Sequence, residues 1–197
     1  MTGPQPSRQA ATKIAVRDQL LTARRRRPLT EVGAAARSLA EVLLDAPEVR
    51  RAATVACYVS VGAEPGTTTL LDRLLAAGKR VIVPVLLPDN DLDWAPYTGA
   101  ASLAPARRGL LEPVTARLGV DAVATADVVL VPGLAVGPDG TRLGRGGGSY
   151  DRALGRVPVG TFTCVLLYDD EVLPAVPTEP HDRPVTAAAT PGGLVRV

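Results

Sequence analysis

Runs of apolar and β-branched residues recur along the chain, each about as long as a buried strand. They are residues 54–61 (TVACYVSV), 80–87 (RVIVPVLL), 127–136 (DVVLVPGLAV) and 159–168 (VGTFTCVLLY). Runs that are apolar at nearly every position are typical of strands buried on both faces of a parallel sheet. Residues 68–80, TTLLDRLLAAGKR, lie between the first two runs and predict a helix that Gly78 ends. A strand, a helix and a strand in this order indicate a βαβ unit, and therefore a parallel sheet.

Two more helices are expected before the first strand. One begins at Thr12 and is ended by Pro28, and its apolar residues are Ile14, Leu20 and Leu21. Thr30 is expected to cap the other, whose apolar face consists of Val32, Ala35, Leu39, Val42 and Leu43. Residues 1–11 are expected to form a flexible tail.

The middle and the end of the chain carry weaker patterns. PDND (88–91) predicts a turn, and LDWAPY (92–97) predicts an edge strand because Pro96 cannot donate a hydrogen bond to a ladder. Residues 99–126 are rich in Ala, Gly and Pro and predict no regular element, and 159–168 is the last strand expected. Since there is no internal repeat and no linker, the pattern predicts one α/β domain over residues 1–197.

Composition limits the possible partners. Apolar residues make up 46% of the 197, which is enough for a core, but only 3% are aromatic, so Val, Leu and Ala must build it. A net charge of +2 argues against a dedicated nucleic-acid binder. No apolar run is long enough to span a membrane, and the N-terminal residues lack the apolar stretch of a secretory signal. We therefore expect a cytoplasmic protein with neither a membrane nor a nucleic-acid partner.

The scarcity of cysteine and histidine limits the chemistry further. Two cysteines and one histidine are too few for a zinc finger, an iron–sulfur cluster or a histidine-rich catalytic metal centre. In the cytoplasm, Cys57 and Cys164 are expected to be reduced core residues. Chemistry must then rest on carboxylates, guanidinium groups, backbone amides and any metal ion that these hold. Lysine is scarce as well, because the sequence contains only Lys13 and Lys79.

The glycine-rich segment 142–152, RLGRGGGSYDR, carries the strongest chemical signal. Its glycines permit positive φ angles, and successive backbone amides ahead of a short helix form a nest for phosphate oxygens. Arg142, Arg145 and Arg152 add positive charge, and Asp151 is placed to hold Mg²⁺ beside a nucleotide. The spacing matches neither the dinucleotide fingerprint nor the Walker A loop. A plain surface turn is the alternative, but a position at the carboxyl end of a buried strand favours a ligand site.

Other polar residues allow more than one interpretation. Lys13 and Arg17 are four residues apart and share a helix face, which is either a solvated surface or a site for anions. Glu64 follows the strand 54–61 and could be a general base, a ligand anchor or an exposed loop carboxylate. A triad of Ser149, His181 and Asp182 is rejected, because GGGSYD lacks the second glycine of a nucleophile elbow and adjacent His and Asp residues do not orient each other as a triad requires.

Residues 131–152, VPGLAVGPDGTRLGRGGGSYDR, closely resemble the signature of the 5-formyltetrahydrofolate cyclo-ligase (methenyltetrahydrofolate synthetase) family. Other motifs of that family follow the same order along residues 12–185: K-x-x-x-R, Glu64 with Thr67, GKRVIVPV, LLEP and VP-x-E-x-HD. The resemblance implies a three-layer α/β/α domain with a mostly parallel sheet, similar to the sugar-phosphate isomerase/CoA-transferase superfamily. It also implies ATP- and Mg²⁺-dependent conversion of 5-formyltetrahydrofolate to 5,10-methenyltetrahydrofolate, through phosphorylation of the formyl oxygen and attack by N10. We expect the protein to be a monomer.

The resemblance assigns roles to individual residues. Lys13 and Arg17 are expected at the ATP phosphates, together with a loop that wraps the nucleotide and consists of Arg142, Leu143, Gly144, Arg145, Gly146, Gly147, Gly148, Ser149 and Tyr150. Arg145 and Tyr150 are the expected catalytic residues. Asp151 is expected to bind Mg²⁺ with Asp182 as a second ligand, and Val59 and Glu64 are expected to bind the pterin of the folate. Lys13, Arg17, Arg142 and Arg145 are expected to meet at the triphosphate, and Lys79 to be structural.

Two positions depart from the family pattern. Ser149 stands where members usually carry an aromatic residue, so Tyr150 alone would supply a ring there. Gly147 stands where some members carry a basic residue, which leaves more of the phosphate charge to Arg145. The alternatives are a sugar-phosphate isomerase-like or CoA-transferase-like enzyme, which would bind phosphate without hydrolysing ATP, and a ligand-sensing domain of the same fold. A sensor of this kind would normally carry a DNA-binding helix-turn-helix, and the N-terminal helices show no recognition-helix pattern.

Overall fold

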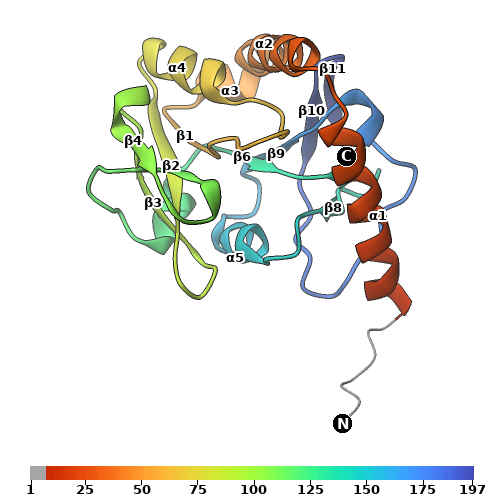
Figure 1. The fold of residues 1–197 in the computed structure, drawn as a ribbon. Helices are drawn as coiled ribbons and strands as arrows, with labels where there is room; N and C mark the ends of the chain where they lie inside the picture. Colours follow the sequence, from red (N-terminus) through yellow and green to blue (C-terminus); the bar gives the residue numbers. More distant parts are fainter. Residues whose placement is uncertain (1–7) are drawn as a thin grey trace.

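The computed structural model describes residues 8–197, through which a seven-stranded sheet runs (Figure 1). The order of its strands is β11-β10-β9-β6-β1-β2-β3. Their bounds are β1 Thr54–Cys57, β2 Arg80–Leu86, β3 Leu92–Pro96, β6 Val128–Pro132, β9 Phe162–Leu166, β10 Ala187–Thr190 and β11 Gly193–Arg196. Every neighbouring pair among β10, β9, β6, β1 and β2 is parallel, and the two edge strands β3 and β11 are antiparallel. The predicted parallel sheet and the predicted edge strand are both confirmed.

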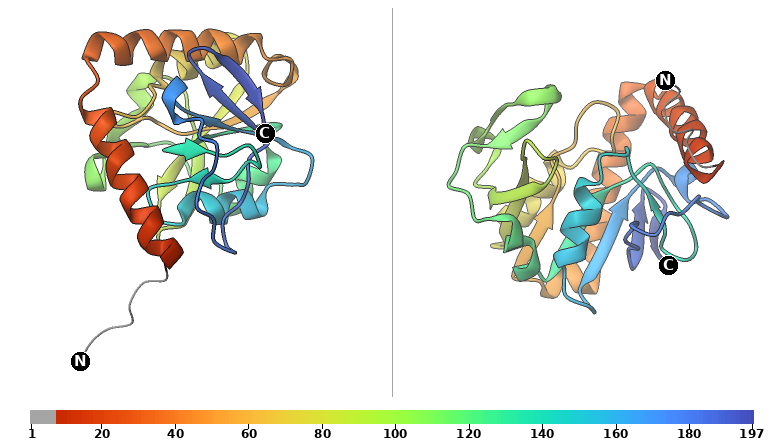
Figure 2. Two further views of the ribbon diagram at one scale, coloured as in Figure 1. Left: turned by 90° about the vertical axis from the view of Figure 1, so that its right-hand side faces the viewer. Right: turned by 90° about the horizontal axis from the view of Figure 1, so that it is seen from below.

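Helices cover both faces of the sheet (Figures 1 and 2). On one face lie α2 (Leu29–Asp45), α3 (Pro47–Arg51) and α4 (Thr68–Ala76), and on the other lie α5 (Ser149–Arg156) and the 3₁₀ helix η3 (Val120–Thr125). Alternate strand residues point to opposite faces, so Val55 and Cys57 pack among the first set of helices and Ala56 packs on the side of α5. Because both faces are buried, the strands are apolar at nearly every position.

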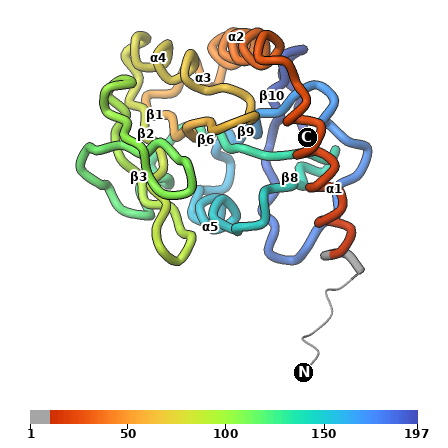
Figure 3. The backbone as a smooth tube through the Cα atoms, viewed as in Figure 1, coloured from red at the N-terminus to blue at the C-terminus, as the bar shows by residue number. Residues whose placement is uncertain are grey.

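The helix α1 (Arg8–Arg25) lies along one side of the sheet rather than on a face (Figures 1 and 3). Val16, Leu20 and Leu21 pack on a small ribbon formed by β7 (Ala135–Val136) and β8 (Arg142–Leu143). Ile14, expected on the apolar face, is instead 49% exposed. The expectation of a flexible tail over residues 1–11 is wrong in part, because the helix begins at Arg8; residues 1–7 lie outside the described part of the chain.

Several predicted boundaries also need correction. Thr30 does not cap α2, because Pro28 with extended backbone takes that position and its carbonyl accepts the amides of Glu31 and Val32. The predicted strand 127–136 is broken after Pro132, since the chain turns at Gly133 and continues as β7 in the ribbon with β8. The short helix α3 and the strands β10 and β11 were not predicted. The sequence of β10 is AAAT, and alanine has little strand preference, so its pairing with buried neighbours decides the structure there.

The segment 99–126, for which no element was predicted, contains a second small ribbon. It is formed by β4 (Leu103–Pro105) and β5 (Leu111–Pro113), with the short 3₁₀ helices η1 (Ala100–Ser102) and η2 (Arg107–Gly109) beside them. Glu112 Oε1 accepts a hydrogen bond from the backbone amide of Leu86 at 2.9 Å, which attaches the ribbon to the end of β2. Among the described residues, no helix has the length and apolar character that a membrane span requires.

The cysteines behave as predicted. Cys57 and Cys164 are free and buried in the core, and burial raises the pKa of both thiols. A thiol that stays protonated is a poor nucleophile, so neither side chain is suited to covalent chemistry.

A buried ion pair attaches α1 to the sheet. Arg24 donates from Nε and Nη2 to the two carboxylate oxygens of Glu171, both at 2.7 Å, and from Nη2 to the carbonyl of Gly133 at 2.6 Å. Glu171, in the 3₁₀ helix η4 (Asp169–Glu171), also accepts the backbone amide of Tyr168 at 2.9 Å. Arg24 and Glu171 are 2% and 1% exposed. Each charge is therefore satisfied by its partner and by one hydrogen bond with the backbone, which accepts from Arg24 and donates to Glu171.

We expect the substitution Glu171→Gln to lower the free energy of unfolding by about 3–5 kcal/mol, because it leaves the Arg24 guanidinium buried without a counter-charge. The matched control is Glu31→Gln, which removes the carboxylate of an exposed ion pair with Arg27 and is expected to lower it by less than about 1 kcal/mol. Urea denaturation of the two variants and the wild type measures both values. Equal losses in the two variants would contradict this interpretation of the buried pair.

Candidate active site

The strand order creates a crevice beside β1. The chain proceeds from β1 to β2 on one side, while β6 lies on the other side of β1, so connections leave the carboxyl ends of β1 and β6 in opposite directions. Ligands of open α/β sheets bind at such a point, outside the carboxyl ends of the strands. A cavity of about 280 Å³ lies there, lined by Tyr58 and Val59 after β1 and by Pro132 and Gly133 at the end of β6.

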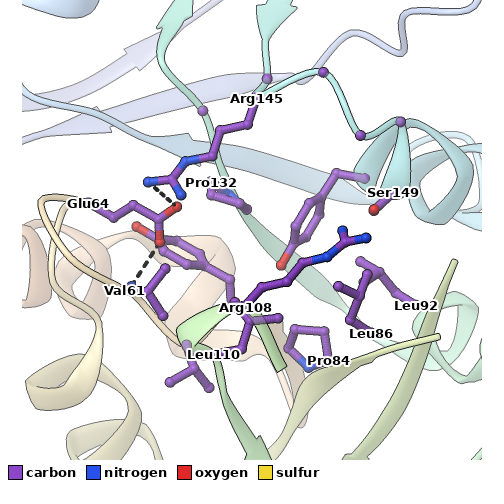
Figure 4. A pocket seen from close by; sticks show the side chains of 18 of the residues that line it. Val61, Glu64, Pro84, Leu86, Leu92, Arg108, Leu110, Pro132, Arg145 and Ser149 are labelled. Atoms are coloured by element: carbon purple, nitrogen blue, oxygen red, sulfur yellow. Dashed lines mark hydrogen bonds and ion pairs between the residues drawn. The ribbon is translucent and has the colours of Figure 1, made fainter. Parts of the chain in front are cut away.

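This first cavity has largely apolar walls with one deeply buried carboxylate (Figure 4). The hairpin of β2 and β3 contributes Pro84, Leu86 and Leu92, and the ribbon of β4 and β5 contributes Leu110. Glu64 lies on one side of the cavity, with Arg145 directed at it from the glycine-rich loop. An apolar cavity with few polar groups is suited to an aromatic or fused-ring small molecule.

The loop that carries Glu64 is held from within. The amide of Ser60 donates to the hydroxyl of Thr67 at 2.9 Å, and the amide of Thr67 donates to the hydroxyl of Ser60 at 3.0 Å. Tyr58 donates from its hydroxyl to the carbonyl of Pro65 at 2.7 Å. A Cβ atom on Gly66 would lie 2.9 Å from that of Ala36, so the loop packs closely on α2. These contacts keep the Glu64 side chain pointing into the cavity.

The environment of Glu64 favours its protonated form more than water does. The side chain is 7% exposed, and this burial raises the pKa of Glu64 above its usual value. The amide of Val61, which donates to Oε2 at 2.9 Å, and the guanidinium of Arg145, 3.3 Å from Oε1, oppose the rise. The protonation state of Glu64 therefore depends on the balance between burial and nearby hydrogen-bond donors or charges, which a ligand in the cavity would change.

A second cavity of about 790 Å³ adjoins the first, and the glycine-rich loop is their common wall. Residues that line both are Arg142, Gly144, Gly146, Gly147, Gly148 and Asp151. Gly146 and Gly148 have φ angles of 93° and 70°, which side chains rarely permit, and Gly148 immediately precedes α5. The amides at the start of α5 and the absence of side chains on the loop make this wall accessible to anions.

Two basic side chains, those of Arg17 and Arg142, contact the glycine-rich loop or the helix that follows it. Arg17 of α1 donates from Nε to the carbonyl of Gly144 at 2.9 Å. Arg142 is 4% exposed and donates to the carbonyl of Pro132 at 3.1 Å and to Asp151 Oδ1 at 2.9 Å. A Cβ atom on Gly144 would lie 2.8 Å from Nη1 of Arg142, so glycine is needed for this close approach. Arg142 thereby joins the end of β6 to the first turn of α5.

Lys13 is buried against carboxylates of the segment before β10. Its Nζ lies 2.8 Å from Oε2 of Glu179 and 2.6 Å from Oδ2 of Asp182, and the residue is 2% exposed. The hydrogen bond from Lys13 lowers the pKa of Glu179. Burial works against the same effect on Asp182, but the hydrogen bonds from Lys13 and the amide of Glu179 outweigh it and lower the pKa of Asp182. His181 is exposed and has its Nε2 3.9 Å from both carboxylates.

The structure brings together most of the predicted site residues. Lys13, Arg17 and Arg142 all line the second cavity, as do Asp151 and Asp182. The fourth predicted cation, Arg145, is directed to Glu64 and lines the first cavity, which Val59, Ser149 and Tyr150 also line. Burial raises the pKa of Tyr150 well above its usual value, so its hydroxyl stays protonated. His181 lines the second cavity and Ser149 the first.

Glu179 and Arg108 are among the charged residues of these cavities that were not singled out from the sequence. Glu179 is separated from its partner Lys13 by 166 positions, so no local pattern joins them. Its one signal is its place in the motif VP-x-E-x-HD, three positions before the predicted Asp182. Arg108 lines the first cavity from η2, in the segment for which no element was predicted.

An open α/β sheet with a glycine-rich anion loop between two cavities defines the class: a small-molecule enzyme that brings a phosphate-bearing ligand against a second ligand. Residues 9–191 match the model of the 5-formyltetrahydrofolate cyclo-ligase family. The 5-formyltetrahydrofolate cyclo-ligase of Mycolicibacterium smegmatis is 43% identical over 143 residues, which are 70% of this chain and 73% of that protein. The chain therefore belongs to the 5-formyltetrahydrofolate cyclo-ligase family, as its motifs predicted.

More distant relatives agree in name and in fold. The 5-formyltetrahydrofolate cyclo-ligase of Escherichia coli strain K12 is 35% identical over 153 residues, covering 74% of this chain and 81% of that protein. The NMR structure of 5,10-methenyltetrahydrofolate synthetase from Aquifex aeolicus superposes with a TM-score of 0.81 at 27% identity, covering 93% of this chain and 92% of that one. The shared architecture thus extends over nearly the whole of both chains.

We expect the substitution Glu64→Gln to stabilise the protein at neutral pH. Folding raises the pKa of Glu64. At a pH between the pKa of Glu64 in the unfolded chain and its pKa in the folded protein, the folded protein therefore binds more protons than the unfolded chain. The free energy of unfolding of the wild type therefore falls as the pH rises through this window. That of Glu64→Gln does not fall, because glutamine carries no titratable group. Urea denaturation of both proteins, from below the ordinary glutamate pKa of about 4.3 to neutral pH, measures the difference. A difference that does not grow with pH would contradict the prediction.

Proposed function

We propose that the protein uses its two cavities to convert 5-formyltetrahydrofolate and ATP into 5,10-methenyltetrahydrofolate, ADP and phosphate. The observation that carries the proposal is the shared wall: the glycine-rich loop lines a cavity with a buried carboxylate on one side and a cavity with several cations on the other. Two ligands in these cavities would meet at the loop. Such an arrangement can align a formyl oxygen with a terminal phosphoryl group, which is the main requirement of the reaction.

The second cavity is suited to the nucleotide. Lys13, Arg17 and Arg142 supply positive charge, and the loop from Gly144 to Gly148 supplies backbone amides, all of which suit phosphate oxygens. Leu143 precedes this stretch and packs beneath α1, so the loop is anchored on its core side. Ser149 and Tyr150 follow it at the start of α5. We assign this cavity and this loop to ATP.

The carboxylates of the second cavity fit a magnesium ion. Asp151 and Asp182 both line it and offer the oxygen ligands that this ion prefers. Each already holds a cationic side chain, Asp151 at 2.9 Å from Arg142 and Asp182 at 2.6 Å from Lys13, so both lie where positive charge is accommodated. The amide of Arg183 donates to Asp151 at 3.3 Å, which places the two carboxylates on adjoining segments. Mg²⁺ bound there would neutralise phosphate oxygens of ATP.

The first cavity is suited to the folate. We assign the pterin to the end of the cavity where Val59 and Glu64 lie, because a buried carboxylate can accept hydrogen bonds from the N–H groups of a fused ring. Arg145 lies at the same end, on the loop that faces the nucleotide. Tyr150, with its protonated hydroxyl, lines this cavity from α5. We therefore propose that Arg145 and Tyr150 contact the reacting formyl group.

The chemistry follows from this placement. The formyl oxygen attacks the γ-phosphorus of ATP, and the bond to the bridging oxygen breaks as ADP leaves. N10 then attacks the activated carbon and loses its proton, and the carbon–oxygen bond to phosphate breaks as the ring closes. The contribution of the protein is to orient the two ligands and to stabilise the charge that spreads over the phosphoryl group, which needs no side-chain nucleophile.

We expect that purified protein mixed with 5-formyltetrahydrofolate, ATP and Mg²⁺ will produce the absorbance band of the methenyl product, with one ADP released per product. Controls without ATP or without Mg²⁺ should show no band. The sugar-phosphate isomerase-like alternative predicts instead that phosphate esters bind while ATP stays intact. Absence of the band with ATP unconsumed would overturn the proposed function.

The two lysines provide a matched pair of variants. We expect Lys13→Met to raise the KM for ATP by about tenfold or more, since a hydrogen bond to a charged group contributes about 1.5–3 kcal/mol. The KM for the folate should change little. Lys79→Met is the control, because its Nζ donates to the carbonyls of Arg50 and Ala52 near α3 and does not line either cavity. Steady-state kinetics with each substrate varied in turn tests this, and a rise in the folate KM alone would refute the role of Lys13.

A further inference from the structure

Arg108 stands out at the rim of the first cavity by its backbone conformation. Its φ and ψ angles are 59° and 25°, in the left-handed region that a bulky side chain seldom adopts. Within residues 8–197 the other non-glycine residue with positive φ is Asn90, at 66°. Nη1 of Arg108 donates to the side-chain oxygen of this same Asn90 at 3.0 Å. The two unusual conformations thus occur at the two ends of one contact, which is the kind of outlier that functional sites retain.

The position of Arg108 is opposite to that of Glu64. In Figure 4, Glu64 and Arg145 lie on one side of the cavity, while the guanidinium of Arg108 extends toward the side of Ser149 and Leu86. Between the two ends the wall is apolar and is formed by residues such as Pro84 and Leu110. The cavity therefore has a carboxylate at one end, an apolar middle and a cation at the other end.

The charge of Arg108 is not balanced by a carboxylate. Its described hydrogen bond goes to a neutral amide, and none of the ion pairs described for residues 8–197 includes it. Glu112 also lines the cavity, but its Oε1 already accepts the amide of Leu86. A second guanidinium, that of Arg152, donates to the backbone carbonyl of Asn90 at 3.1 Å. Because Arg152 lines the second cavity and not the first, the cation that this end of the first cavity offers to a ligand is Arg108.

The proposed substrate has a matching order of groups. 5-Formyltetrahydrofolate carries a fused ring with the formyl group, then an aromatic p-aminobenzoyl spacer, and then a glutamate with free carboxylates. With the pterin at Glu64, the spacer lies on the apolar middle and the carboxylates reach the rim. A guanidinium forms its strongest hydrogen bonds with carboxylates, and it offers five N–H donors in total.

We propose that Arg108 binds a carboxylate of the glutamate end of the folate substrate, with the turn at Asn90 holding the guanidinium in place. This inference rests on the proposed function, since it takes the folate as the ligand of the first cavity. The contact is remote from the formyl group and is the same before and during the chemical step. It should therefore lower the KM for the folate without changing kcat.

The test uses two substrates and the intact enzyme. Steady-state kinetics are measured with 5-formyltetrahydrofolate and with 5-formyltetrahydropteroate, which lacks the glutamate, on the wild type and Arg108→Gln. We expect Arg108→Gln to raise the KM for the folate by about tenfold, the size of one charged hydrogen bond. With the pteroate, wild type and variant should have equal and high KM values. The ATP KM and kcat should be unchanged.

Further variants distinguish binding from structure. Arg108→Lys should recover part of the affinity, because it keeps the charge. Arg107→Gln is the matched control, since it removes an adjacent arginine of η2 that does not line the cavity, and it should behave as the wild type. If Arg108→Gln unfolds, Arg108→Asn replaces it, because asparagine tolerates the left-handed conformation.

Each result decides the question. A KM rise in Arg108→Gln that is equal for folate and pteroate, or no rise at all, would overturn the role of Arg108 while leaving the proposed function intact. A wild type that cyclises neither substrate would refute the proposed function itself. Calorimetric titrations without ATP measure the affinity of wild type and Arg108→Gln for both compounds, which tests the carboxylate contact separately. Equal affinities of the two proteins for the folate would overturn it.

Discussion

The buried pair of Arg24 and Glu171 is the contact on which the geometry of the site depends. It fastens the end of α1 to the carbonyl of Gly133, where the chain leaves β6, and to the segment after β9. Arg17 lies on the same helix about two turns earlier, and Lys13 about three turns earlier. A buried charge without its partner is strongly destabilising. Placements of α1 that separate Arg24 from Glu171 are therefore unfavourable. The pair therefore helps to determine where Lys13 and Arg17, the cations that α1 contributes to the second cavity, lie relative to the glycine-rich loop.

The same contact reaches the first cavity through Tyr168. Its backbone amide donates to Glu171, the guanidinium of Arg24 lies 5.6 Å from the centre of its ring, and its hydroxyl donates to the carbonyl of Ala63 at 3.3 Å. Ala63 is adjacent to Glu64 in the loop after β1. One network thus connects α1, the end of β6 and the loop of the buried carboxylate. Since these three segments form the walls on either side of the glycine-rich loop, the relative position of the two cavities follows from packing distant from both ligands.

Sequence patterns predicted the elements of the fold whose structure is decided by interactions within a short segment. Strands buried on both faces show as apolar runs, and the glycines of segment 142–152 show where the backbone must approach a ligand, so the parallel sheet and the loop were predicted. β10 was missed because alanines become a strand there only through burial between β9 and β11. The pairing of Lys13 with Glu179 was missed because it depends on how α1 docks. Arg108 was missed because its contact is with Asn90 in the turn between β2 and β3, 18 positions away. Tertiary contacts that join segments remote in sequence leave no local signal.

The charges of the site are arranged as pairs that ligands can exchange. Lys13 is paired with Glu179 and Asp182, Arg142 with Asp151, and Arg145 with Glu64. In the proposed function Lys13 and Arg142 face phosphate and Arg145 faces the formyl group. Asp151 and Asp182 face Mg²⁺, and Glu64 faces the pterin. Binding of Mg-ATP would then replace the carboxylate partners of Lys13 and Arg142 by phosphate. It would also replace the cationic partners of Asp151 and Asp182 by Mg²⁺, so that these four charges stay compensated. In the proposed function the site would therefore bind a nucleotide strongly only together with Mg²⁺, because without the ion Asp151 and Asp182 would lose their cationic partners to phosphate.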